Sequence, residues 1–459
     1  MGRFSSFAVS FSLISVLTGI FANFDFGFRQ AGADIVWTWL LVAAGQTLVA
    51  LVMANLSIRF PIAGYGYQWA ARLANTDVGF FVGWLLLMQF LTGIPGICQT
   101  FVVALCGMAG VHTSSALLVG GTVAVISLVT LIHLFGIKAA SRVNDLGVYA
   151  ELAGILFLIL ALAFFWVVSG EVLQENLVVA TQRMGEGLSR LSGLTLSLLL
   201  GAWCLTGFEA AADLAEETES PTTSVPRAVM TSHFTASISG FLILVLLVAN
   251  AGRIAPGREA GGTLLRILEG TMGTRLASFV VLFVVVSVFA CAVAAMATAS
   301  RLLFSMARDR ILPFSEWIAK VDVRSQTPRH AVWLVWGFST ASILFFRRIE
   351  MVTNVSALAS YLGYSGILYA ALRGTRSEGS AFLHPAGWQR PVQWAALIWT
   401  LSVVLALSVP ETVVDGFETR HLPALSTGTA LGLGVMLYLL FVRDRIRTGR
   451  AGPPKPSNP

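Results

Sequence analysis

The segment Trp203-Cys204-Leu205-Thr206-Gly207-Phe208-Glu209 decides the fold, and it lies inside an apolar run that begins near Leu191. A helix crosses roughly 30 Å of hydrocarbon in about 20 residues, so Gly207 and Glu209 fall near the middle of this span. Glycine weakens a helix, and an ionised glutamate at that depth is unstable unless it has a partner. Broken backbone and charge are tolerated in a membrane only where protein encloses them. The segment therefore predicts a central polar site within a helical bundle.

A second apolar span carries a similar tripeptide. Leu205-Thr206-Gly207-Phe208 matches Leu17-Thr18-Gly19-Ile20 in the first hydrophobic run, and both copies lie at mid-span. Interrupted helices at corresponding places in two halves of a chain are typical of the midplane binding site of a transporter. The alternative is that these small residues only allow close packing between helices. We predict breaks in the first and the sixth span.

The composition indicates a membrane protein with many spans. Of 459 residues, 56% are hydrophobic and 12% are charged, which is too much apolar surface for one soluble core. The first apolar run starts near Phe4 without a basic segment beyond Arg3 or a small-residue cleavage site, so we interpret it as a retained span. The four cysteines lie in apolar runs without metal-like spacing, so we predict packing roles and neither a metal nor a cofactor.

Windows of about 20 apolar residues predict twelve spans. They lie at about 5–28, 35–58, 79–107, 115–135, 146–168, 192–214, 229–250, 276–299, 330–346, 352–372, 391–409 and 424–442. With the N-terminus inside, about two-thirds of the Lys and Arg residues fall in cytoplasmic loops, as the positive-inside rule requires. We therefore predict a multi-pass protein of the cell (inner) membrane with both termini in the cytoplasm.

Three segments outside the spans have a recognisable pattern. Residues 60–72 begin with a helix breaker and become aromatic and amphipathic, which predicts a short interfacial helix. Residues 258–272 place leucines among polar residues and predict a helical cap on the extracellular side. The tail, residues 443–459, ends in a run rich in proline and is predicted to be a disordered cytoplasmic segment.

Three of the acidic residues within predicted spans are candidates for a functional role. Glu209 is interpreted as a proton-carrying or gating carboxyl group, with a structural bond to the broken backbone as the alternative. Glu151, in the fifth span, serves either proton coupling or a hydrogen bond between helices. Asp25 lies four residues before Arg29, so it either pairs with that cation on one helix face or contacts the substrate.

Breaks at two span centres would supply both kinds of backbone partner. Free amides at the start of a half-helix receive an anionic group, and free carbonyls receive a cation. That combination suits a zwitterion. Aromatic side chains are candidates for the walls of the site, with packing as the alternative, and those are Phe21, Trp203, Phe208, Tyr361 and Tyr364.

The chain resembles the amino acid, polyamine and organocation (APC) superfamily over nearly its whole length. The motifs are Thr206-Gly207-Phe208-Glu209 with the loop 215–228, the segment Pro61-Ile62-Ala63-Gly64-Tyr65-Gly66-Tyr67-Gln68-Trp69-Ala70, and residues 301–313. Through Leu17-Thr18-Gly19-Ile20-Phe21 it is most similar to the amino acid and choline transporter branch, although many relatives carry a Gly-Ser-Gly type break there.

The resemblance implies an all-α membrane fold of twelve helices with a five-plus-five inverted repeat. The first repeat would occupy residues 1–168 and the second residues 192–372, with two additional spans over 391–442. Helices 1 and 6 would be the broken ones.

We interpret the chain as a secondary active transporter of amino acids or related amines that works by alternating access, with proton coupling or exchange. The partners are a small-molecule substrate, the lipid bilayer and, if transport is proton-coupled, protons; no nucleic acid is predicted, and the oligomeric state is left open. The predicted substrate-binding residues are Thr18, Gly19, Ile20, Phe21, Asp25, Trp203, Thr206, Gly207 and Phe208.

Within this set, Thr18 to Phe21 would offer amides to a substrate carboxylate, and the backbone around Gly207 would accept its ammonium group. The alternative is a transport-like sensor or subunit that binds without translocating. An enzyme is disfavoured because the spans contain neither paired His and acid at metal spacing nor a nucleophilic Ser with a base.

Overall fold

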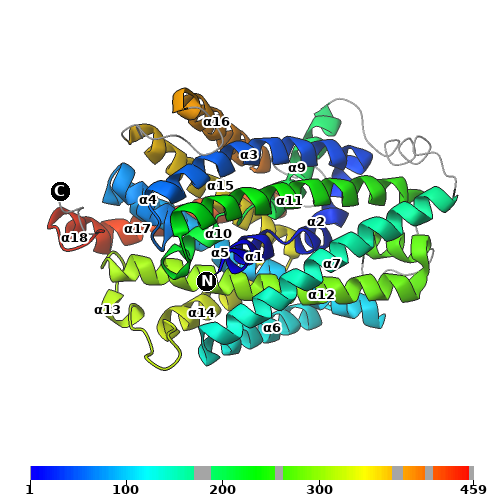
Figure 1. Ribbon diagram of the computed structural model, residues 1–459, viewed down its shortest axis with the longest axis horizontal. Helices are drawn as coiled ribbons and strands as arrows, with labels where there is room; N and C mark the ends of the chain where they lie inside the picture. Colours follow the sequence, from blue (N-terminus) through cyan, green and yellow to red (C-terminus); the bar gives the residue numbers. More distant parts are fainter. Residues whose placement is uncertain (1, 170–187, 254–261, 375–385, 409–416, 454–459) are drawn as a thin grey trace.

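The computed structural model describes residues 2–169, 188–253, 262–374, 386–408 and 417–453. Over these residues the protein is built from helices, and its one β-bridge joins Asp322 to Thr327. Most helices run along the long axis of a single bundle (Figure 1). Nine helical segments in the described residues are long and apolar enough to cross a membrane. This architecture agrees with the predicted all-α membrane fold.

The long helices coincide with the predicted spans. They are α1 (Arg3–Ile14), α2 (Val16–Ala31), α3 (Ile35–Arg59), α5 (Thr76–Ala109), α6 (Ser115–Phe135), α7 (Ile137–Ser169), α9 (Leu188–Cys204), α11 (Pro221–Ala249), α12 (Gly262–Arg308), α14 (Arg329–Phe346), α15 (Ile349–Arg373), α16 (Gln389–Leu407) and α17 (Phe417–Leu437). Among the described residues there are also four short α-helices. They are α4 (Tyr65–Leu73), α10 (Ala210–Asp213), α13 (Ser315–Ile318) and α18 (Arg443–Arg447).

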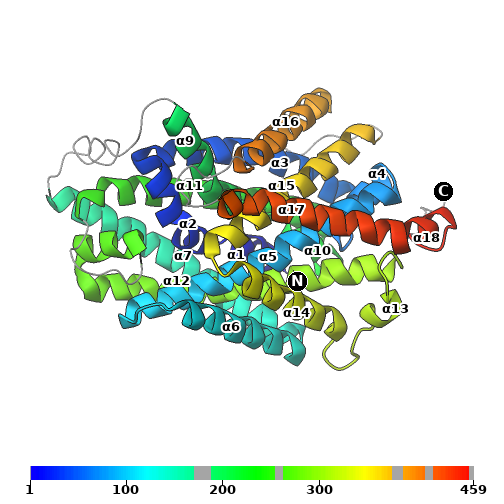
Figure 2. The ribbon, with the colours of Figure 1, turned by 180° about the vertical axis from the view of Figure 1, so that it is seen from behind.

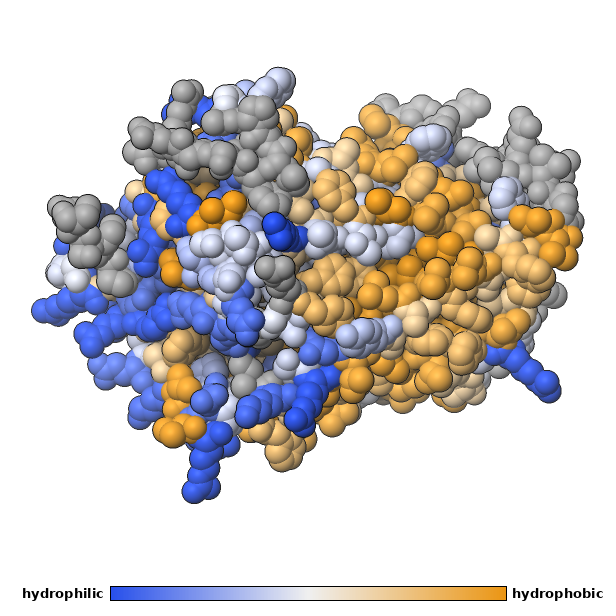
Figure 3. All heavy atoms as spheres, in the orientation of Figure 1, coloured by the Kyte–Doolittle hydropathy of each residue, from blue (hydrophilic) through white to orange (hydrophobic). Residues whose placement is uncertain are grey.

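Two ends of the bundle differ in chemistry. Charged residues gather where α4, α13 and α18 lie, and apolar side chains cover most of the remaining surface in this view (Figure 3). We call the first the basic end; its cations include Arg59, Lys138, Arg142, Arg301, Arg308, Arg324 and Arg445. The opposite end, where α12 begins, is the distal end.

Both predicted breaks are present. The helix of the sixth span stops at Cys204 and resumes at Ala210, with Gly207 at φ 94° between them. The helix of the first span stops at Ile14 and resumes at Val16, with Ser15 in the left-handed region at φ 35°. In Figure 2 α1, α2 and α10 lie in the middle of the bundle, among α3, α5, α7 and α12, and α9 runs from there to its edge.

The position of the first break corrects the prediction. Thr18 to Phe21 lie within regular α2, three or more residues beyond the interruption at Ser15. Gly19 donates its amide to the Ser15 carbonyl as a helical residue does, at 2.9 Å. A Cβ atom on Gly19 would overlap the Cys204 side chain, so this glycine allows α2 and α9 to approach closely.

The predicted interfacial helix is also corrected, because α4 is buried. Its residues from Tyr65 to Ala71 are covered by the bundle. Tyr67 donates a hydrogen bond to Asp309 Oδ2 at 2.7 Å, and Gln68 donates to the same oxygen at 2.8 Å. Burial, together with the neighbouring Asp309, raises the pKa of the Tyr67 hydroxyl above its ordinary value, so the hydroxyl remains a donor. Asp309 thus fixes α4 to the end of α12.

The tail prediction is wrong for its first residues. Residues 443–447 form α18, and Arg445 donates to the Leu312 carbonyl at 3.0 Å. A guanidinium bonded to a backbone carbonyl holds this turn against the basic end. Residues 454–459 and residues 258–261 of the predicted cap lie outside the described residues, whereas residues 262–272 are helical, as predicted.

Replacing Asp309 with Ala should destabilise the protein by about 3 kcal/mol, because two buried donors lose their shared charged acceptor. Thermal unfolding of the purified protein in detergent measures the change. Asp444→Ala is the control, since Asp444 is an exposed acid at the same end. Equal unfolding midpoints for the two variants would contradict the proposed anchoring of α4.

Candidate functional site

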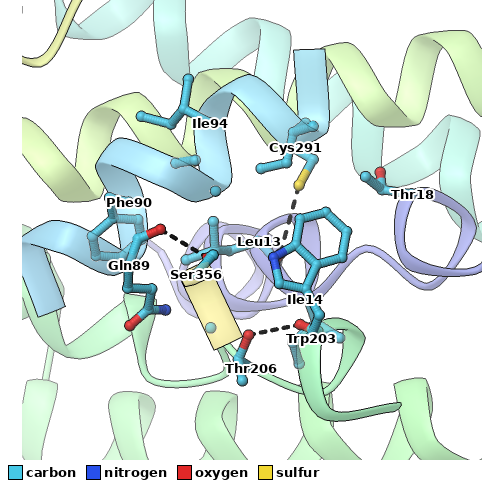
Figure 4. Close-up of a pocket in the computed structure, with 14 residues that line it drawn as sticks. Leu13, Ile14, Thr18, Gln89, Phe90, Ile94, Trp203, Thr206, Cys291 and Ser356 are labelled. Carbon is cyan, nitrogen blue, oxygen red and sulfur yellow. Dashed lines mark hydrogen bonds between the residues drawn. The ribbon is translucent and has the colours of Figure 1, made fainter. Parts of the chain in front are cut away.

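Three cavities follow one another through the bundle. The volume in which the centre of a water molecule fits is about 40 Å³ in the central cavity. It is about 380 Å³ in the basic-end cavity and about 130 Å³ in the distal cavity. The central cavity is lined by Leu13, Ile14, Thr18, Gln89, Phe90, Gly93, Ile94, Ile97, Trp203, Thr206, Gly207, Cys291, Ala295 and Ser356 (Figure 4). Its walls therefore come from both breaks and from α5, α12 and α15.

The same helices line successive cavities. Along α12, Val281 lines the distal cavity, Cys291 the central cavity and Ser300 the basic-end cavity. Along α5, Thr100 lines the distal cavity and Gln89 the central one. The three cavities thus form one ordered series with the smallest in the middle.

The break between α9 and α10 is held by side chains of other helices. Gln46 of α3 donates to the Leu205 carbonyl at 3.0 Å, and the amide of Gly207 faces the Tyr364 hydroxyl at 3.4 Å. A Cβ atom on residue 207 would lie 2.7 Å from Leu13 Cγ, and φ is positive there, so only glycine fits without strain.

Glu209 lies directly after this break and is 1% exposed. Its Oε1 accepts hydrogen bonds from Tyr364 at 2.8 Å and from Tyr65 at 3.4 Å. Its Oε2 has no hydrogen-bond partner in the described structure. One half of the carboxyl group is therefore fixed and the other half is available to a proton or a ligand.

The break between α1 and α2 is held by Glu151 of α7. The Leu17 amide donates to Glu151 Oε1 at 3.4 Å, and the Thr18 amide donates to the Ser15 hydroxyl at 3.4 Å. This places Glu151 at the start of α2, as the hydrogen-bonding alternative anticipated. The same contact does not test a role in proton coupling.

The predicted substrate residues divide between two cavities. Thr18, Trp203, Thr206 and Gly207 line the central cavity. Phe21 and Asp25 line the distal cavity instead. Gly19, Ile20 and Phe208 are buried without lining either cavity, and the Phe208 ring packs against His233 and Tyr364.

Two polar residues at the centre were missed from the sequence. Gln89 lines the central cavity, and its Oε1 is buried without a partner. Tyr364 was considered only as an aromatic wall, but its hydroxyl joins Glu209 and Gly207. Gln89 follows Leu85-Leu86-Leu87-Met88, so an amide within an apolar run was the signal that could have identified it.

Comparison with known proteins now identifies the family. The family model described as amino acid permease matches residues 1–433. The chain belongs to the amino acid permease family. The resemblance to the APC superfamily is thereby confirmed, and the family indicates a membrane transporter and not an enzyme.

Curated relatives align with this permease over most of their length. "Amino-acid permease BAT1" of Arabidopsis thaliana is 25% identical over 96% of this chain and 91% of the relative. "Amino-acid permease BAT1 homolog" of Oryza sativa is 24% identical over 96% and 90%. An uncharacterized amino-acid permease of Schizosaccharomyces pombe is 24% identical over 79% and 68%.

The basic end of the permease is closed by ion pairs beside its cavity. Arg301 of α12 pairs with Glu217 at 2.9 Å, and Arg308 pairs with Glu216 at 3.5 Å. Glu216 also accepts the Ala63 amide at 3.2 Å. The loop after the second break is therefore tied to both α12 and the segment before α4.

Asp25 closes the distal end in a way the sequence did not predict. Its two carboxylate oxygens accept the amides of Thr263 and Leu264, at 2.8 and 2.9 Å, at the start of α12. The predicted pairing with Arg29 is wrong, because Arg29 bonds the Asp25 backbone carbonyl and pairs with Glu350 at 3.6 Å. The reason is that the first amides of a helix offer an acid two fixed donors.

Asp25→Ala should loosen the cap formed by residues 262–272 and expose the distal cavity, because two charge-assisted bonds to the start of α12 are lost. We expect a cysteine at Thr100, in a background without the four native cysteines, to react at least tenfold faster with a water-soluble maleimide. Arg29→Gln, the control, should leave the rate nearly unchanged. Equal rates in the two variants would show that Asp25 does not hold the cap in place.

Proposed function

We propose that this permease is a secondary active transporter that moves an amino acid or a related amine by alternating access. The observation that carries the proposal is the ordered series of cavities, the smallest of which is lined by residues of both broken helices. A water needs about 10 to 15 Å³ of such volume, so the central cavity, at about 40 Å³, has room for a few waters and must widen to admit a substrate. Substrate would enter from either side as the flanking helices move.

The proposed topology has twelve crossings and an inverted repeat. Within the described residues nine apolar segments are long enough to cross a membrane, and the segment Phe4–Arg59, at 56 residues, is long enough for two crossings. The paired helices α9 and α10, together with α14, supply the remaining two. The repeats would be residues 1–168 and 192–372, with 391–442 added. The cations at the basic end support a cytoplasmic location for that end and for both termini of the chain.

Substrate would contact residues at the two breaks. Thr18, Trp203, Thr206 and Gly207 are proposed to line the substrate, because they already face the central cavity. Phe208 would not touch the substrate but would support the wall of the central cavity by packing against Tyr364. Trp203 would hold an ammonium group against its ring.

Glu209 is proposed to carry the coupled proton. Support comes from its burial, its unpartnered Oε2 and its position next to Gly207 in the second break. A buried carboxyl group with one free oxygen can bind and release a proton as its surroundings change. Movement at the break would then change both substrate contacts and the setting of this group.

The transport function is tested by measuring the uptake of a panel of labelled amino acids and amines into proteoliposomes. Wild-type protein should accumulate at least one class, and Gly207→Leu should reduce uptake at least tenfold, because the new side chain would meet Leu13 and strain the backbone. Gly337→Leu is the control, since a Cβ atom there meets nothing within 4 Å. Binding without uptake by the wild type would favour a sensor.

Glu209→Gln should abolish accumulation driven by a pH gradient while sparing exchange of internal for external substrate. The amide keeps the shape and most hydrogen bonds of the carboxyl group but does not carry the proton. Both rates are measured in the same vesicles. Normal accumulation by Glu209→Gln across a pH gradient would assign this residue to structure alone.

A further inference from the structure

We propose that Glu151 determines the substrate class of this site, because its carboxylate holds the backbone amides that an amino acid carboxylate would need. The wild-type site would then prefer amines over the corresponding α-amino acids. This inference rests on the proposed transport function and narrows the substrate class within it.

The amides at the start of α2 are already engaged. The Leu17 amide donates to Glu151 Oε1, the Thr18 amide to the Ser15 hydroxyl, and the Gly19 amide to the Ser15 carbonyl. The Val16 amide and the Ser15 hydroxyl also interact with the Glu151 carboxylate. The first four amides are the only free donors that a helix start can offer.

Glu151 cannot exchange these partners for water. The residue is 1% exposed and enters the break from α7, which packs beside α1. A substrate carboxylate that sought the same amides would have to displace a buried carboxyl group that already accepts them. Each of these amides has a single hydrogen to donate, so the acceptors that already hold them exclude a second one.

The central cavity presents acceptors on its other walls. Gln89 is 5% exposed, lines the cavity and has a buried Oε1 without a partner. The last carbonyls of α1 are contacted by weak donors, with Cys291 Sγ at 3.6 Å from Leu13 O and Cys204 Sγ at 4.0 Å from Ile14 O.

These acceptors and the Trp203 ring suit an ammonium group. Figure 4 shows Gln89, Trp203, Thr206 and Cys291 together around this space. The cavity can thus bind the ammonium end of a substrate, whereas the α2 amides that would bind its carboxylate already donate to Glu151 and Ser15.

Binding of matched pairs tests the proposal on the full-length protein in lipid nanodiscs. Each pair is an α-amino acid and the amine that lacks its carboxylate, namely alanine with ethylamine, leucine with isopentylamine, and arginine with agmatine. The measured quantity is the ratio of the two affinities within a pair. Wild type should bind the amine of its preferred pair at least tenfold more tightly.

Glu151→Ala should lower that ratio at least tenfold, because the amides become free for a substrate carboxylate. Glu151→Gln should lower it less, since a neutral amide still accepts a hydrogen bond; if Glu151→Ala does not fold, this variant decides. Leu158→Ala, a truncation at another buried position of α7, is the control and should leave the ratio unchanged.

The ratio of the two affinities distinguishes a change in substrate specificity from a loss of structure. A general loosening of the protein would weaken the binding of the amine and of the amino acid alike. A wild-type preference for the amino acid, or a ratio that Glu151→Ala and Glu151→Gln leave unchanged, would overturn the inference while leaving transport in place. Absence of binding and uptake for every amine and amino acid would instead refute the proposed function, and the inference with it.

Discussion

The structure depends on one constraint, which is that backbone groups freed at a helix break inside a membrane must find partners within the protein. At the second break Gln46 supplies a donor to the Leu205 carbonyl, and Ser10 of α1 accepts the Ala211 amide at 3.0 Å. At the first break Glu151 accepts the Leu17 amide. Each break is therefore tied to neighbouring helices, and the polar side chains that satisfy the backbone are concentrated at the centre of the bundle.

This constraint explains what could be predicted from the sequence. Gly207 and Glu209 are costly in an ordinary span, so their presence indicated a break and an enclosed site, and both are found. The first break was placed too late because Gly19 was the obvious candidate. The left-handed residue is Ser15, whose hydroxyl caps α2, while Gly19 serves packing against Cys204. A glycine needed for close approach and one needed for positive φ look the same in a sequence.

Contacts between segments that are distant in the chain could not be predicted from local sequence patterns. The sequence left Asp25 either an ion pair with Arg29 or a contact with the substrate, but the carboxylate bonds amides more than 230 residues away in the chain. Similarly, the aromatic segment around Tyr67 had the pattern of an interfacial helix, yet it is buried because Asp309 at the end of α12 accepts two of its donors. An amphipathic pattern specifies that one face is covered and leaves open whether lipid or protein covers it.

The two central acids differ in what they leave available. Glu151 is engaged by the backbone of α2, so any tilt of α2 must lengthen or replace that hydrogen bond. Glu209 is held through Oε1 by Tyr65 and Tyr364, which belong to α4 and α15, and keeps Oε2 free. Movement of the first break therefore acts on Glu151, which already accepts a backbone hydrogen bond. The second break carries Glu209, whose Oε2 has no hydrogen-bond partner among the described residues. This asymmetry is the physical basis for assigning selection to Glu151 and proton transfer to Glu209.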